Sequence, residues 1–141
     1  MLGMTYFDWP VTVGDNDVRL FFVPEGDTSM DLTGSTLRLS ITWSGGEIVL
    51  SSASPVVIDD LQYGIWLEDQ ANPLTTGFFG VRLTVEQTDM LPNEPNWFGR
   101  AGTYNPPPER ARYEVQYEVD GASAVIVAGT VIATKWITPN G

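Results

Sequence analysis

The stretch that decides the fold is Thr36-Leu37-Arg38-Leu39-Ser40-Ile41-Thr42-Trp43, in which every second residue is large and apolar. Successive side chains of a β-strand point to opposite faces, so this period places all the apolar residues, Trp43 included, on one core-facing side. The same alternation recurs in Val81–Glu86 and in Arg112–Val119. Each stretch predicts a strand with one buried and one wet face, as is typical of antiparallel sheets.

Shorter apolar runs predict further strands, and turn-forming residues separate them. Ser44-Gly45-Gly46 and Asp120-Gly121 predict tight hairpins in which glycine supplies a positive φ. Glu86–Leu91 predicts a short helical segment that Pro92 ends. We expect a bend at Gly129 in the last and longest run. The runs are Trp9–Val13, Val18–Val23, Glu47–Ser51, Val56–Ile58, Gly64–Glu68 and Ala124–Thr134.

Strands this short, with turns this regular, predict one all-β domain over residues 1–141, either a sandwich or a partly closed barrel.

The amino-acid composition narrows the range of possible functions. The 141 residues include 18 Asp and Glu against 7 Lys and Arg, a net charge of −11, with no His and no Cys. This excludes disulfides, thiolate and imidazole metal sites and His-dependent catalysis. It also argues against binding to nucleic acid or to anionic membranes, and no run of about 18 apolar residues could span a membrane.

One segment breaks the regular pattern. Residues 92–109 contain five prolines and two glycines and lie between two predicted strands. Loops longer than about 12–15 residues are uncommon in compact domains and tend to be functional or disordered. Because interface energy concentrates in aromatic anchors, we expect this Pro-rich loop to dock a partner. Its candidate partner-binding residues are Trp97, Phe98, Arg100 and Tyr104, the arginine pairing with an acidic group on the partner.

The N-terminal arm, residues 1–10, is unusually apolar for a chain end. Two roles are open for it: an edge strand of its own domain, or a strand captured by a neighbouring subunit. Its candidate interface residues are Tyr6, Phe7 and Trp9.

The order of several motifs adds a family resemblance. Asp31-Leu32-Thr33-Gly34-Ser35-Thr36 before an apolar strand resembles the N-terminal domain of the phage baseplate upper protein family. Gly80–Leu91, Tyr113–Val119 and Val127–Ala133 resemble later strands and turns of that family in the same order, and Trp136-Ile137-Thr138 resembles its ending. The resemblance implies an immunoglobulin-like antiparallel β-sandwich, a structural role in a virion and assembly as a homo-oligomer, most simply a trimer.

Two departures from the family refine this expectation. The loop at residues 92–109 is much longer than usual, and family members usually continue into a coiled coil or a receptor-binding module. We therefore expect a non-enzymatic virion protein without a cofactor, an adaptor in a tail, baseplate or fibre attachment that docks other virion proteins. Capsid decoration is the alternative within this class. A carbohydrate-binding module for host adsorption is the alternative outside it.

Two acidic features have ordinary explanations. The loops with Asp15 and Asp17, and with the turn Glu25–Asp31, offer oxygen ligands for calcium, but Asp and Asn also favour turns by bonding their own backbone. Asp59-Asp60 could suggest a glycosidase carboxylate pair, yet neighbouring residues of a strand point to opposite faces. We expect turn chemistry and solvated acids, and therefore no metal and no catalytic residue.

Among the tryptophans, Trp9, Trp66 and Trp136 lie in strand contexts typical of a core or an interface. Trp97 differs from them because it lies in the irregular loop, where local packing and a sugar contact are the alternatives to a protein anchor.

Overall fold

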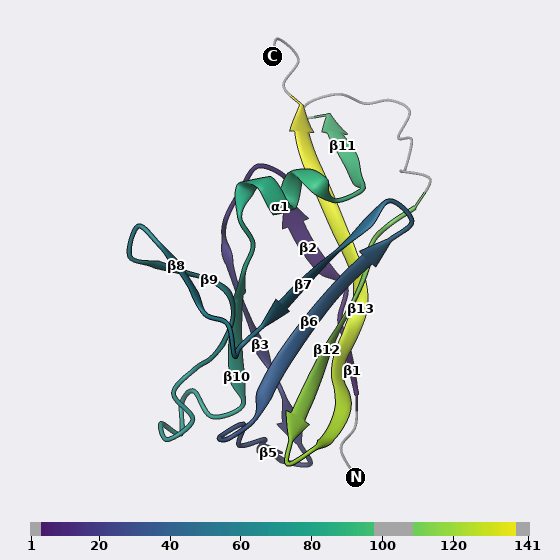
Figure 1. Ribbon diagram of the computed structural model, residues 1–141. Helices are drawn as coiled ribbons and strands as arrows, with labels where there is room; N and C mark the ends of the chain where they lie inside the picture. Colours follow the sequence, from purple (N-terminus) through teal and green to yellow (C-terminus); the bar gives the residue numbers. More distant parts are fainter. Residues whose placement is uncertain (1–3, 98–108, 138–141) are drawn as a thin grey trace.

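The computed structural model describes residues 4–97 and 109–137 (Figure 1). This part of the chain is mostly β-strand, with a short helix, α1 (Val85–Met90). The longest strands are β6 (Thr36–Trp43), β12 (Arg112–Val119) and β13 (Ala122–Ile137). The others are β1 (Thr5–Tyr6), β2 (Trp9–Thr12), β3 (Val18–Phe22), β4 (Pro24–Glu25), β5 (Thr28–Ser29), β7 (Gly46–Ser51), β8 (Val56–Ile58), β9 (Leu61–Leu67), β10 (Phe78–Arg82) and β11 (Asn93–Trp97).

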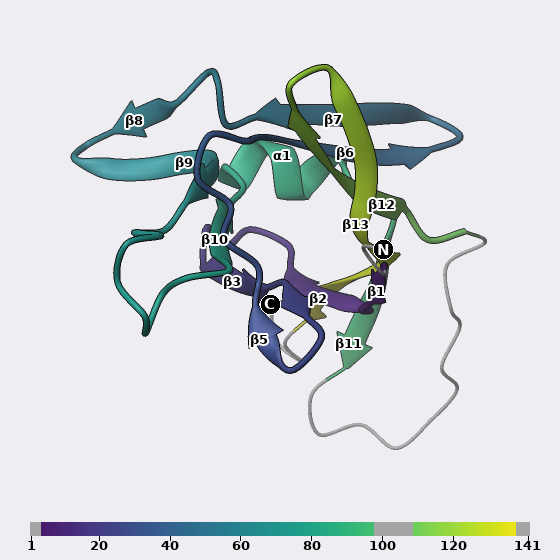
Figure 2. The same cartoon turned by 90° about the horizontal axis from the view of Figure 1, so that it is seen from below.

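Two large sheets pack against each other (Figure 2). The seven-stranded sheet has the order β1-β13-β12-β6-β7, with β2 and β11 also paired to β13, and the four-stranded sheet has the order β3-β10-β9-β8. β4 and β5 form a separate hairpin. The predicted all-β sandwich is confirmed.

The alternation in the deciding stretch produces the core. Leu37, Leu39 and Ile41 of β6 are fully buried, and Trp43 packs against them at the edge of the core. On β12, Tyr113 and Val115 are buried in the same cluster. Both strands have the predicted bounds, because nearly every inward position is apolar and every outward position is polar.

An aromatic cluster joins the two sheets. The Phe21 ring stacks on the Phe79 ring with 5.1 Å between centroids, both from the four-stranded sheet. Trp9 of β2 meets Phe21 edge-on at 5.6 Å and Tyr113 edge-on at 5.4 Å. Edge-to-face pairs add roughly 0.5–1.5 kcal/mol each beyond the burial of their area. The cluster therefore fixes how the two sheets lie on each other.

Strand β13 runs without a break through Gly129, where its pairing with Tyr113 of β12 is regular and no bulge marks the expected bend. The irregularity lies earlier, at Ile126, which is the extra residue where Val115 pairs with Val127 and Gln116 pairs with Val125. Gly129 has another purpose. A Cβ there would lie 2.0 Å from the carbonyl oxygen of Phe7, so only glycine lets the N-terminal segment run this close beside the strand.

Both predicted hairpins form, but for different reasons. Asp120 and Gly121 have φ of 49° and 80°, the positive values that a two-residue hairpin requires. In the hairpin between β6 and β7, Gly45 and Gly46 do not have positive φ, so that part of the prediction is wrong. Side chains there would press on the Trp43 indole, because their Cβ atoms would lie 3.1–3.2 Å from its ring.

The strand predicted to continue through Val85 ends at Arg82, and helix α1 replaces its last part. Thr84 is the N-cap of this helix. Its hydroxyl oxygen accepts a hydrogen bond from the Gln87 backbone amide, and its own backbone amide donates to the Gln87 side-chain oxygen. This capping box satisfies two backbone donors of the first turn and so favours a helix start at this point. The helix stops at Leu91, whose backbone is extended before Pro92.

The sheet is not purely antiparallel, and the Pro-rich loop is not wholly irregular. β1, β2 and β11 all pair with β13 in parallel. β11 occupies Asn93–Trp97, inside the segment predicted to be a loop. The pairing of β12 with β13 ends at Thr130. β11 pairs with β13 from Ala133 onward and so extends the sheet past that point.

The Tyr113 hydroxyl gives a test of this packing. It donates to the Phe7 carbonyl at 2.5 Å, and burial, with a smaller contribution from Asp8, raises the pKa of the Tyr113 phenol well above its ordinary value. The neutral phenol is therefore favoured in the folded state. The contribution of this hydrogen bond to the free energy of unfolding is complete below the unfolded-state pKa of about 10 and is lost as the pH rises above that value.

We expect Tyr113→Phe to lower the free energy of unfolding by roughly 1 kcal/mol at pH 7, the usual contribution of such a hydrogen bond. The variant should also lose less stability than wild type between pH 9 and pH 11, measured by urea unfolding at each pH. Tyr117→Phe, on the same strand, is the control. Equal pH dependence in wild type and Tyr113→Phe would contradict this account.

Candidate docking surface

Apolar side chains lie exposed on the outer face of the four-stranded sheet. Along β3, Phe21 points into the core, whereas Leu20 and Phe22 point outward and are 50% and 40% exposed. β10 repeats the pattern: Phe79 is buried, and Phe78, opposite Phe22 in the register, lies outside. One phenylalanine of each Phe-Phe pair therefore serves the core and the other serves the surface.

Trp66 extends this outer face on β9. Its register partner on β10 is Gly80, which in turn pairs with Leu20 on β3. A Cβ on Gly80 would lie 2.4 Å from two carbons of the Trp66 indole, so the ring lies directly over the glycine. The indole nitrogen donates to Glu68 Oε2 at 3.0 Å, which fixes the ring in this position.

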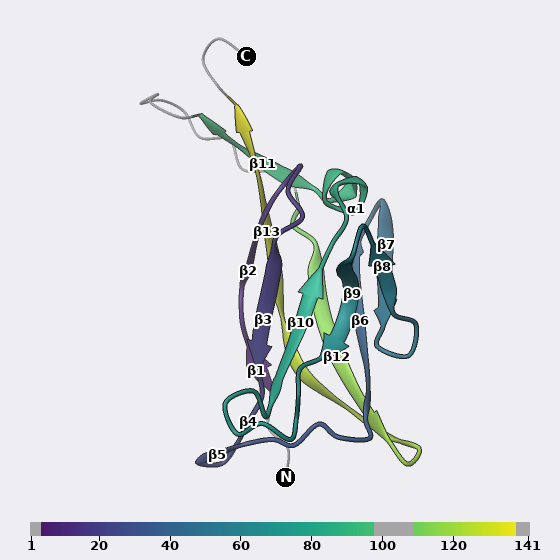
Figure 3. The ribbon, with the colours of Figure 1, turned by 90° about the vertical axis from the view of Figure 1, so that its left-hand side faces the viewer.

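These side chains form one continuous surface. The Phe22 and Phe78 rings are 5.0 Å apart between centroids, one register row from Leu20 and Trp66. Figure 3 shows β3, β10 and β9 side by side. We call Leu20, Phe22, Trp66 and Phe78 together the aromatic face.

Exposure of this face has an energetic consequence. Covering a Leu or Phe side chain stabilises a protein or a complex by about 1.5–3 kcal/mol. Single exposed apolar residues are ordinary, but a contiguous apolar group marks an interaction site. Val18, 44% exposed, extends the same side of β3 by one more residue. The aromatic face is therefore a candidate docking surface for a partner.

Charged residues flank the aromatic face at its two ends. Glu68 lies beside Phe78, since its amide donates to the Phe78 carbonyl at 3.1 Å. Arg82 lies at the other end of β10, opposite Val18 and Gly64. The Arg82 guanidinium donates to the Gln62 carbonyl at 3.3 Å and lies 5.6 Å from the centre of the Tyr63 ring. One end of the face is thus acidic and the other basic.

The hairpin of β8 and β9 projects from the same sheet (Figure 1). It carries four exposed aliphatic side chains: Val56, Val57, Ile58 and Leu61. Asp59 and Asp60 form its turn with φ of 52° and 65°. They therefore lie in a turn and not on a strand, which corrects the reason given above for setting aside a carboxylate pair. Their positive φ suits the turn chemistry of Asp.

The N-terminal arm is an edge strand of its own domain. β1 pairs with β13, and the Phe7 amide donates to the Ala128 carbonyl at 2.9 Å. Phe7 meets Phe21 edge-on at 5.8 Å, and Tyr6 is 66% exposed. Trp9 is only 3% exposed, so its expected place at a partner interface is wrong for this conformation: it belongs to the core.

The structure says less about the predicted partner-binding residues of the Pro-rich loop. Trp97 ends β11, paired with Ile137 of β13. Phe98, Arg100 and Tyr104 lie outside the described residues.

Side chains anchor the two ends of the segment that contains these residues. Arg110, just before β12, forms an ion pair with Glu94 of β11, which is 7% exposed. Its neighbour Glu109 accepts from the hydroxyl and the amide of Ser44, in the turn between β6 and β7.

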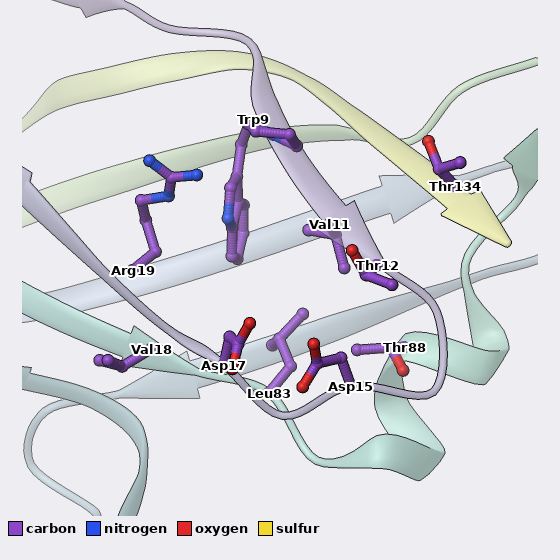
Figure 4. A pocket seen from close by; sticks show the side chains of 11 residues that line it. Trp9, Val11, Thr12, Asp15, Asp17, Val18, Arg19, Leu83, Thr88 and Thr134 are labelled. Atoms are coloured by element: carbon purple, nitrogen blue, oxygen red, sulfur yellow. The ribbon is translucent and has the colours of Figure 1, made fainter. Parts of the chain in front are cut away.

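A groove of about 350 Å³ lies between the β2–β3 turn and helix α1, and Asp15 and Asp17 are among its lining residues (Figure 4). The pKa of Asp17 is raised, chiefly by a hydrogen bond with Asp15 and by the negative charge of Asp15. Asp15 also accepts from the Asn16 amide at 2.7 Å, which is ordinary turn chemistry. Within residues 4–97 and 109–137, no three acidic side chains come together as a metal site.

Most of the aromatic face was absent from the residues chosen from sequence. A usable signal was present in Phe21-Phe22 and Phe78-Phe79, because alternation must turn one member of each pair outward.

Comparisons with known proteins add no identity. No protein-family model matches the sequence, and no curated protein is significantly similar to it. No helix in the described part of the chain is long and apolar enough to cross a membrane.

The contact between Trp66 and Gly80 gives a test of the geometry of the aromatic face. We expect Gly80→Ala to displace the indole and to lower the free energy of unfolding by about 1–3 kcal/mol, as overpacking does. In a Trp66→Ala background the same substitution should be neutral or stabilising, because alanine suits a strand better than glycine. Urea unfolding of the four proteins measures this coupling. Equal effects in both backgrounds would contradict the placement of Trp66.

Proposed function

We propose that this chain is a non-enzymatic structural domain of a virion that docks a neighbouring virion protein on its aromatic face. The observation that carries the proposal is that Leu20 and Phe22, which are exposed, and Trp66 and Phe78, which are partly buried, lie together on one sheet face. Apolar and aromatic anchors at the centre of a patch supply most of the energy of protein interfaces, and polar groups surround them. Glu68 and Arg82 provide that polar rim.

The place in the particle comes from the resemblance. The Asp31–Thr36 motif and the order of the later strands resemble the phage baseplate upper protein family, which favours a tail, baseplate or fibre-attachment adaptor. Capsid decoration is the alternative, and copy number separates them: a few to dozens per particle for a tail component, hundreds for a capsid component. The lack of His and Cys supports a role without catalysis.

One observation favours a second candidate, a carbohydrate-binding module. The Trp66 indole lies over Gly80 and is held by a hydrogen bond to Glu68. Sugar rings stack on such aromatic surfaces, and a carboxylate beside the ring offers acceptors for sugar hydroxyls. The apolar neighbours Leu20, Phe22 and Phe78 favour a protein partner instead, because they offer no hydrogen bonds to a sugar.

The experiment is incorporation into particles. In cells that produce the phage, a tagged copy of the chain should co-purify with particles in a density gradient. We expect Leu20→Ser with Phe22→Ser to reduce incorporation at least tenfold, because two central anchors are lost. Val49→Ser is the matched control, since Val49 is 42% exposed on β7 in the other sheet.

Three outcomes would contradict parts of this proposal. Absence of the wild-type chain from purified particles removes the virion role. Equal incorporation of the double variant and the control removes the aromatic face as the docking site. Glycan-array binding that Trp66→Ala abolishes, with incorporation unchanged, favours the carbohydrate-binding module.

A further inference from the structure

We propose that the partner on the aromatic face is a second copy of this chain, packed face to face about a two-fold axis, in place of the trimer that the family resemblance implies. The inference rests on the proposed docking role and specifies its occupant. A two-fold interface brings the same patch of both copies together, so the patch must be complementary to itself. The arrangement of rows on β3, β10 and β9 meets this requirement.

The outward-facing residues form three register rows. The middle row holds Leu20, Gly80 and Trp66. One outer row holds Val18, Arg82 and Gly64, and the other holds Phe22 and Phe78, with Glu68 beside Phe78. Each outer row is two residues from the middle row, or about 6.5–7 Å along the strands.

A two-fold axis along the middle row exchanges the outer rows. The middle row of one copy then faces the middle row of the other. Leu20 faces Leu20 of the second copy, and each Trp66 indole, which lies over its own Gly80, faces the Trp66 indole of the second copy. Each Arg82 is brought above the row that contains Phe78 and Glu68 of the other copy. An Arg side chain there is within reach of both the carboxylate and the face of the Phe78 ring.

Charge complementarity favours a second copy over an unrelated acidic or basic partner. The positive end and the negative end of the patch each find the opposite charge when the strands of the two copies run in opposite directions. A two-fold axis along β10 would instead place Arg82 over Arg82, which like-charge repulsion disfavours. At net charge −11 the two copies repel at long range, so association is best measured near 0.15 M salt, where the screening length is about 8 Å.

The sequence offers a direct test because it contains no Cys. Leu20→Cys places a thiol on the proposed axis, next to its equivalent in the second copy. We expect mild oxidation to convert most of this variant at 50–100 μM to a disulfide-linked dimer. Val49→Cys, of similar exposure on the other sheet, should form at least tenfold less dimer.

Charge exchange tests the orientation. Analytical ultracentrifugation of the wild-type chain should show a dimer, and Arg82→Glu or Glu68→Arg alone should weaken association at least tenfold. The double variant should recover most of it, because the opposite charges again meet. Leu20→Lys should be monomeric, and Val49→Lys should associate like wild type. Circular dichroism identifies any variant that fails to fold, and the cysteine pair then remains as the independent measurement.

A wild-type chain that stays monomeric up to 1 mM, or equal crosslinking of Leu20→Cys and Val49→Cys, would overturn the inference. If such a monomer still needs the aromatic face to enter particles, the proposed function stands and its partner is a different protein. If the chain dimerises as described but is absent from particles, the virion role fails and the dimer stands.

Discussion

The structure depends on the contact between Phe21 and the aromatic rings around it. Phe21 stacks on Phe79 within its own sheet and meets Trp9 and Tyr113 of the other sheet edge-on. The chain has neither a disulfide nor a metal site in its described part that could join the sheets. Burial and ring geometry therefore do so. The N-terminal arm closes this cluster, because the Phe7 ring packs on Phe21 and the Phe7 carbonyl accepts a hydrogen bond from the Tyr113 hydroxyl.

The same strands that form the core also produce the aromatic face. Because β3 and β10 alternate, Phe21 and Phe79 enter the core only if Phe22 and Phe78 point outward. An outward residue is free to be polar, as the other strands show: β6 and β12 have Thr, Ser, Arg, Glu and Gln at such positions. β3 has Val18, Leu20 and Phe22 instead. The difference between these sheets is therefore not required by folding, and a partner gives it a purpose.

The strand pattern was predictable where the alternation is strict, and the functional surface was not. β6 and β12 have the expected bounds because each apolar position has one possible direction. Trp9 and Trp66 both lie in strands, so period alone could not tell that one is buried and the other lies outside over Gly80. That distinction depends on which strands are neighbours. The sequence does not predict β11, because Pro95 indicates a loop. Alternation alone places Val85 in a strand, because it does not take account of the Thr84–Gln87 capping box.

The most direct measurement is a cryo-electron microscopy reconstruction of the virion that we propose contains this chain. The central claim is that the outer face of β3, β10 and β9 exists to be covered. The account predicts that Leu20, Phe22, Trp66 and Phe78 are buried beneath a neighbouring subunit. An assembled particle in which these four side chains remain open to solvent would contradict it.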